Sequence, residues 1–68
     1  MQNDEIRTIL KDLPVTIKGL CYHDDDGTPV IVLNSRLPRE IQLLTFQHEM
    51  DHILRGEMYD ITYIEYGA

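Results

Sequence analysis

Apolar side chains recur at helical spacing near the start of the chain. Within residues 3–12, Ile6, Ile9 and Leu10 lie three and four positions apart, which is the period of an amphipathic helix with one buried stripe. Pro14 disfavours the helical conformation at the residue before it, so a helix has to end there. We therefore predict a short N-terminal helix over residues 3–12.

Residues 15–33 follow the periodicity of strands instead. Apolar and polar side chains alternate over residues 15–18, and the β-branched run at residues 30–33 is typical of a second strand. The segment between them, residues 24–29, contains Asp-Gly, a dipeptide that favours a tight reversal. This pattern predicts an antiparallel β-hairpin with a solvated acidic loop at its tip.

A longer helix is predicted over residues 38–55. Pro38 suits the first helical position, and Gly56 supplies the left-handed residue that ends a helix. Placed at 100° intervals, the large apolar side chains gather on one face. They are Leu43, Phe46, Met50, Ile53 and Leu54. Another face carries Ile41, Thr45, His48 and His52 beside the charged residues, as a cleft lining would.

The segment after Gly56 completes the predicted fold. Residues 61–65 are expected to form a short helical turn that packs back across the longer helix. The whole chain, residues 1–68, is then a single α+β domain. It consists of an N-terminal helix, a β-hairpin, a long helix and a C-terminal helical turn.

Charge and size narrow the classes of function. Twelve acidic and six basic residues give a net charge of −6, which argues against a nucleic-acid surface and against an anionic membrane surface. No apolar run approaches the roughly 20 residues of a membrane span, and the polar, acidic N-terminus is no secretory signal. We expect a cytoplasmic protein. Because so short a chain has a small core and only one cysteine, a bound metal or a homodimer would supply the missing stability.

The pattern His48-Glu49-x-x-His52 carries the candidate chemistry. Two histidines four positions apart on a helix project side by side, so their imidazoles can bind one zinc ion. Glu49 is turned by 100° from His48, where its carboxylate can take a proton from a zinc-bound water. The motif therefore predicts His48 and His52 as metal ligands and Glu49 as the catalytic base of a zinc hydrolase.

A catalytic zinc ion needs a third protein ligand. Downstream of the motif, Glu57, Asp60 and Glu65 carry suitable carboxylates, and Cys21 on the hairpin offers a thiolate. We favour Glu65, because a helical turn that packs back from Gly56 would bring it to the metal.

The chain resembles the ImmA/IrrE family of metallopeptidases over roughly residues 13–66. The matching segments are Leu13-Pro14, Lys18-Gly19-Leu20, Asp26-Gly27, Ile31-Val32-Leu33-Asn34-Ser35, Thr45-Phe46-Gln47-His48-Glu49-Met50-Asp51-His52-Ile53 and Ile64-Glu65. This resemblance implies a minimal zincin-like core in which His48, His52 and Glu65 hold Zn²⁺ and Glu49 is the general base. It also implies a protein substrate, a helix-turn-helix repressor of a phage or mobile element.

Other interpretations stay open. The zinc-helix segment, residues 47–52, is also similar to that of peptide deformylases, which use a cysteine as third ligand. Here Cys21 lacks the Glu-Gly before it and the Leu-Ser after it that those enzymes show. A zinc ion with a purely structural role, in an antirepressor or binding module without turnover, is a further alternative. In the simplest alternative the motif binds no metal.

Overall fold

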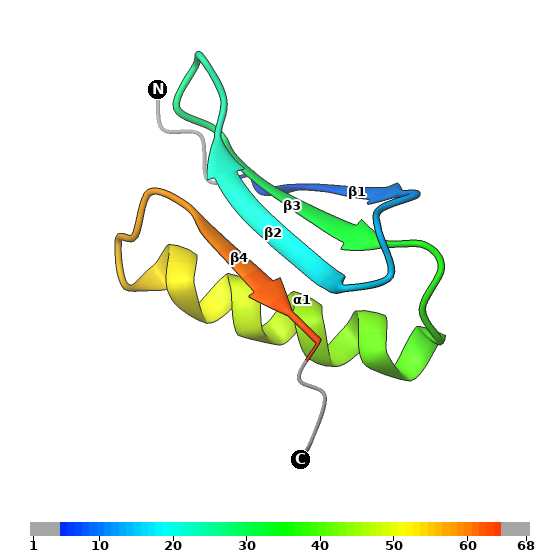
Figure 1. The fold of residues 1–68 in the computed structure, drawn as a ribbon. Helices are drawn as coiled ribbons and strands as arrows, with labels where there is room; N and C mark the ends of the chain where they lie inside the picture. Colours follow the sequence, from blue (N-terminus) through cyan, green and yellow to red (C-terminus); the bar gives the residue numbers. More distant parts are fainter. Residues whose placement is uncertain (1–4, 65–68) are drawn as a thin grey trace.

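One helix lies across one face of a four-stranded sheet in the computed structural model, which describes residues 5–64 (Figure 1). Along the chain the elements are β1 (Arg7–Lys11), β2 (Ile17–His23), β3 (Pro29–Asn34), α1 (Arg39–Leu54) and β4 (Asp60–Tyr63). The strand order in the sheet is β1-β3-β2-β4, so β1 and β4 form its edges. The predicted α+β class is confirmed.

The predicted hairpin is confirmed as β2 and β3. The two strands pair antiparallel, with Cys21 opposite Ile31. At the tip, the carboxylate of Asp24 accepts hydrogen bonds from the backbone N–H groups of Asp26 and Thr28, at 2.9 and 3.0 Å. Gly27 has a φ of +82°, a conformation that glycine adopts without steric cost. The acidic loop is therefore a structured reversal.

The predicted N-terminal helix is wrong where the structure describes it; positions 3 and 4 lie outside the described residues. Residues 7–11 form β1, which pairs parallel with β3 from Arg7 opposite Val30 to Lys11 opposite Asn34. In so short a segment, spacings of three and four do not separate a helix from a strand. The free edge of β3 offers backbone partners, and this tertiary pairing decides for the strand.

The predicted C-terminal helical turn is also wrong over its described part. Residues 60–63 form β4, which pairs antiparallel with β2, so that Asp60 lies opposite Cys21. The sequence Asp-Ile-Thr-Tyr contains β-branched and aromatic residues, which favour strands over helices. The chain therefore returns from α1 along the edge of the sheet (Figure 1).

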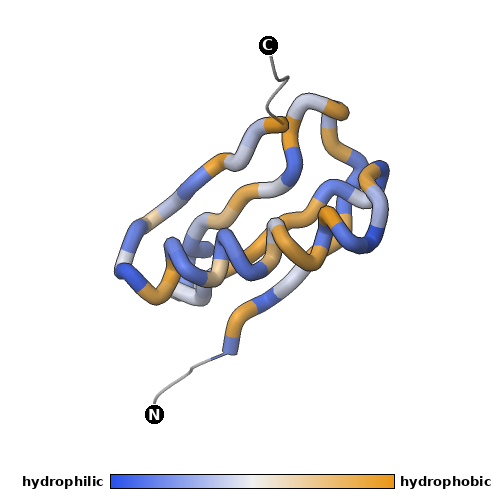
Figure 2. The backbone as a smooth tube through the Cα atoms, turned by 90° about the horizontal axis from the view of Figure 1, so that it is seen from below, coloured by the Kyte–Doolittle hydropathy of each residue, from blue (hydrophilic) through white to orange (hydrophobic). Residues whose placement is uncertain are grey.

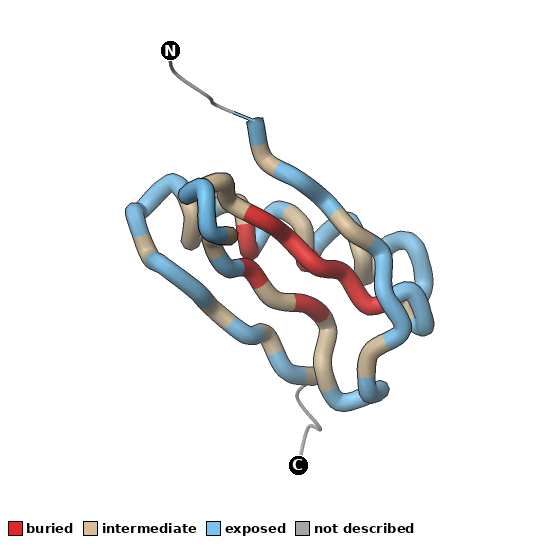
Figure 3. Tube along the Cα trace, turned by 90° about the horizontal axis from the view of Figure 1, so that it is seen from above, coloured by how far each residue is buried: buried red, intermediate tan, exposed pale blue. Residues whose placement is uncertain are grey.

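The core lies between the sheet and α1. Buried residues are concentrated along the central strand β3, with shorter buried stretches in β2 (Figure 3). Cys21, Ile31 and Leu33 form the buried cluster on the side that faces the helix. Phe46, Met50, Ile53 and Ile6 pack against this cluster.

The helix is rotated about its axis relative to the prediction. Hydrophilic and hydrophobic residues alternate along α1 (Figure 2), and its two fully buried residues are Thr45 and Glu49. Phe46, Met50 and Ile53 contact the core as predicted, whereas Leu43 and Leu54 are exposed. The predicted cleft face of the helix is thus turned toward β4.

A glycine in β2 allows this close approach of helix and sheet. A Cβ atom on Gly19 would lie 2.7 Å from Thr45 Cγ2 and 2.7 Å from the carbonyl oxygen of Val32. Both distances are shorter than real Cβ contacts, so a side chain at this position would push α1 away from the sheet.

Among residues 5–64, no helix combines the length and apolar character needed to cross a bilayer.

Candidate metal centre

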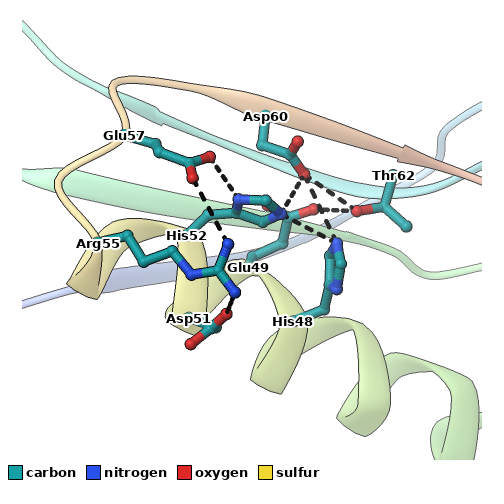
Figure 4. A network of polar contacts seen from close by, with 8 residues as sticks. All are labelled: His48, Glu49, Asp51, His52, Arg55, Glu57, Asp60 and Thr62. Carbon is teal, nitrogen blue, oxygen red and sulfur yellow. Dashed lines mark hydrogen bonds and ion pairs between the residues drawn. The ribbon is translucent and has the colours of Figure 1, made fainter.

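Three potential metal ligands converge where the C-terminal half of α1 meets β4 (Figure 4). The Nε2 atoms of His48 and His52, one helical turn apart, are separated by 3.1 Å. Asp60, the first residue of β4, places its Oδ2 atom 3.4 Å from His52 Nε2 and 3.9 Å from His48 Nε2. The structure thus unites the two histidines of the motif with a carboxylate from another element.

The separations among these three atoms fit a shared metal ion. In a tetrahedral zinc site with ligand bonds of 2.0–2.1 Å, neighbouring ligand atoms lie roughly 3.3 Å apart. The observed distances of 3.1, 3.4 and 3.9 Å bracket that value. Two imidazoles and a carboxylate are also a donor set found in catalytic zinc sites. The residues present therefore fit zinc.

A further carboxylate orients one of the histidines. Glu57 Oε1 lies 2.5 Å from His52 Nδ1, and because a carboxylate accepts, Nδ1 is the donor. This tautomer leaves the Nε2 lone pair of His52 free for a metal, the usual arrangement behind metal-bound histidines. Arg55 in turn lies 3.9 Å from Glu57 and 2.9 Å from Asp51.

The helix end places Glu57 at this position. Gly56 has a φ of +84°, and the backbone N–H of Glu57 donates to the carbonyl of His52 at 3.1 Å. This left-handed reversal is the predicted helix stop. It turns the chain back over His52, so Gly56 brings Glu57 to the second nitrogen of that ring.

The local charges favour a cation at His52. Partial burial lowers the pKa of His52, but the hydrogen bond to Glu57 and the charges of Asp60, Glu57 and Glu49 raise it further than burial lowers it. The net effect is a pKa above the ordinary value. The same negative surroundings that hold a proton on the ring would attract a divalent ion.

Glu49 lies behind the three ligands and is completely buried. Its Oε2 atom accepts a hydrogen bond of 2.5 Å from the Thr62 hydroxyl, which also lies 3.2 Å from Asp60 Oδ2. Oε1 makes no hydrogen bond of normal geometry with a described residue, although the Cys21 thiol lies near the carboxyl group. Burial and the charge of Asp60 raise the pKa of Glu49, whereas Thr62 and the Cys21 thiol oppose the increase. A buried carboxylate oxygen without a partner is costly, which suggests that it has a function.

Cys21 belongs to the surroundings of Glu49 and does not join the metal-ligand group. The thiol is buried in β2, opposite Asp60. Burial and the neighbouring carboxyl of Glu49 raise the pKa of Cys21 to about 12. Among the described residues, the atoms that could share a metal ion come from His48, His52 and Asp60, so Asp60 and not Cys21 stands beside the two histidines.

The carboxylate beside the two histidines belongs to Asp60, whereas the sequence favoured Glu65 as the third ligand. Glu65, the favoured candidate, lies outside the described residues, and Glu57 contacts the far nitrogen of His52 instead of the ligand cluster. Asp60 was one of the candidates, but the predicted helical turn gave no reason to prefer it. If residues 61–63 had been predicted as an edge strand beside β2, Asp60 would have been expected to lie over α1.

A groove opens beside His48 on the outer side of the cluster. It has a volume of about 340 Å³ and runs between α1 and β4. Its walls include Ile41 and Leu44 from the helix and Thr62 and Tyr63 from the strand. The side chain of His48 is 53% exposed, whereas that of His52 is 16% exposed. The open side of the cluster is therefore the side toward the groove.

Comparison of the chain with protein-family models, with curated proteins and with solved structures gave no match.

Proposed function

We propose that the protein is a zinc-dependent metallopeptidase in which His48, His52 and Asp60 hold the ion. The convergence of three ligand atoms within 3.9 Å of one another carries this proposal. The carboxylate of Glu57 supports the proposal as well. It accepts a hydrogen bond from Nδ1 of His52 and leaves Nε2 of the same ring to face the other two ligand atoms, as in metal-bound histidines.

Zinc in such a site lowers the pKa of a coordinated water to roughly 7 and polarises a carbonyl oxygen. The chain supplies the base. Glu49 Oε2 is occupied by the Thr62 hydroxyl, so Oε1 is the atom that would take the proton from the attacking water. Its raised pKa suits a group that must accept this proton and later give it to the leaving amine.

The substrate would approach along the groove beside His48. A volume of about 340 Å³ is at the lower end of ligand sites and suits a short stretch of extended peptide. The resemblance of the motif helix to the ImmA/IrrE family supports a protein substrate. Within that class we propose a helix-turn-helix repressor of a phage or mobile element.

A structural zinc ion without turnover is the second candidate. It is favoured by one observation, the complete burial of Glu49 and its hydrogen bond with Thr62. The two candidates differ in coordination, because a catalytic ion keeps one position for water whereas a structural ion takes four protein ligands. X-ray absorption at the zinc edge distinguishes these two environments.

The proposal is tested with untagged protein, zinc analysis and Glu49→Gln. We expect one zinc ion per chain in both proteins, because Glu49 is not a ligand. Cleavage of a repressor or of a peptide mixture, followed by mass spectrometry, should be found only with the wild-type chain. Cleavage by Glu49→Gln at the wild-type rate would refute Glu49 as the base, and absence of zinc would refute the metal centre.

A further inference from the structure

The groove beside His48 contains one cationic side chain among mostly uncharged walls. Lys18 of β2 lines it together with the apolar side chains of Ile41, Leu44 and Tyr63. His48 contributes to the same groove, so a molecule that reached the metal ligands from this side would pass Lys18. The position of this lysine therefore bears on what the groove accepts.

An irregularity of the sheet brings Lys18 to this place. β2 and β4 pair with Ile17 opposite Tyr63 and Gly19 opposite Thr62, so β2 advances by two residues where β4 advances by one. Lys18 is the extra residue of this β-bulge. Bulges redirect a side chain from the alternation of the strand and are common beside functional sites.

Lys18 has no acidic partner in the part of the chain that the structure describes. Arg7, Arg36 and Arg55 each pair with a carboxylate, whereas Lys11 and Arg39, like Lys18, form no ion pair with a described residue. Of these three, Lys18 is the one that lines the groove beside His48. Lys18 is half-buried as a residue, so part of its side chain lies against the protein while its ammonium group forms no ion pair with a described residue. In a chain with a net charge of −6, an unpaired cation held in a groove by a bulge is best explained by an anionic ligand.

We propose that Lys18 determines specificity by binding a carboxylate of the substrate, so that the groove selects peptides with an acidic group a few residues from the cleaved bond. The carboxylate belongs either to an Asp or Glu side chain or to the C-terminus of the peptide. The apolar walls formed by Ile41, Leu44 and Tyr63 accept the hydrophobic neighbour of that group. The effect of Lys18 on cleavage rests on the proposed peptidase function, whereas its effect on peptide binding does not.

The test uses pairs of synthetic peptides and the zinc-loaded full chain. Each pair differs by Glu against Gln at one scanned position, or by a free against an amidated C-terminus, which separates the two sources of the carboxylate. Binding is followed by chemical shifts of the ¹⁵N-labelled protein and cleavage by mass spectrometry. The variants are Lys18→Met and Lys18→Glu. Lys11→Met on the far edge of the sheet removes the same charge from an exposed position and serves as the matched control.

We expect the acidic member of one pair to bind at least about tenfold more tightly than its neutral partner, because a charge-assisted hydrogen bond contributes that much affinity. The kcat/KM for its cleavage should be higher by the same factor. Lys18→Met should abolish this preference, Lys18→Glu should reverse it toward a lysine-containing peptide, and Lys11→Met should retain it. A preference that survives in Lys18→Met would overturn the inference. So would failure of all peptides to bind at millimolar concentration. Selective binding without any cleavage would support the role of Lys18 and overturn the peptidase proposal.

Discussion

At the scale of single residues, Glu49 shows a conflict between stability and function. Its carboxylate is completely buried, and Oε1 has no partner among the described residues. Buried polar atoms in proteins are nearly always hydrogen-bonded, because an unsatisfied one costs about 1–3 kcal/mol. Glu49 lies directly behind the three proposed metal ligands. We therefore interpret its costly buried charge as a chemical group that the fold tolerates for its function.

Glu49→Gln should therefore stabilise the metal-free protein at neutral pH, by about 1–2 kcal/mol in the free energy of unfolding. Burial raises the pKa of Glu49 in the folded protein. Below the ordinary pKa of a glutamate the carboxyl is protonated in both the folded and the unfolded chain, and no charge is buried. As the pH rises from there through the pKa of the folded protein, the buried group becomes charged and the wild-type protein loses stability. The advantage of the glutamine variant should accordingly grow from pH 4 toward pH 7.

Urea unfolding of both proteins in the presence of a chelator measures this difference. Glu57→Gln is the control, since its carboxylate is partly exposed and holds His52 through a short hydrogen bond. This control should lose stability or stay unchanged. A less stable Glu49→Gln variant would show that the carboxylate is a structural element of the core.

At the scale of secondary-structure elements, the parts that could be predicted are those with a strong local pattern. The helix around His48 has a proline before it, a glycine after it and more than four turns of sequence, and its bounds follow from these signals. The hairpin has an Asp-Gly reversal between a segment of alternating apolar and polar residues and a β-branched run. Each of these patterns specifies its element without reference to the rest of the chain.

The two edge strands could not be predicted in the same way. β1 and β4 have five and four residues, too few for their periodicity to separate strand from helix. Their conformation is decided by pairing with β3 and β2, which are distant in sequence. Because Asp60 lies on β4, the same non-local pairing decided the third member of the proposed metal-ligand group.

Gly19→Ala tests the close packing of α1 on β2. We expect a loss of about 1–3 kcal/mol in the free energy of unfolding, because the new Cβ would lie 2.7 Å from both Thr45 Cγ2 and the rigid carbonyl of Val32. Thr45→Ser removes Cγ2 and keeps the hydroxyl that donates to Ile41 at 2.7 Å.

In a double-mutant cycle by chemical unfolding, Thr45→Ser should therefore recover part of the loss caused by Gly19→Ala. The part that is not recovered reflects the contact with the Val32 carbonyl. Gly19→Ala with wild-type stability would mean that helix and sheet are less closely packed than the structure shows.

At the scale of the whole molecule, 68 residues and one cysteine leave the protein with a small core and no disulfide. Domains of this size are commonly stabilised by a metal ion or by assembly. The ligand cluster joins the last turns of α1 to β4, an edge strand that has only one neighbour in the sheet. A bound ion would thus attach an edge strand of the sheet to the helix.

Zinc removal should lower the thermal stability substantially. At a zinc concentration 100 times the dissociation constant, binding adds about 2.7 kcal/mol, which for a chain of this size raises Tm by roughly 10–20 °C. Differential scanning calorimetry with zinc and with a chelator measures the shift. His48→Ala, which removes a half-exposed ligand, should melt at the same temperature under both conditions. Equal Tm values for the wild-type protein would exclude a stabilising role for the metal.

The most direct test is the zinc affinity of Asp60→Asn, measured by competition with a chromophoric chelator. An amide replaces the carboxylate with little change in shape, so the variant should bind zinc at least about tenfold more weakly than the wild-type chain. Asp51→Asn, the matched change at an exposed carboxylate of α1 that pairs with Arg55 outside the ligand group, should bind with wild-type affinity. Unchanged affinity in Asp60→Asn would contradict the proposed metal centre.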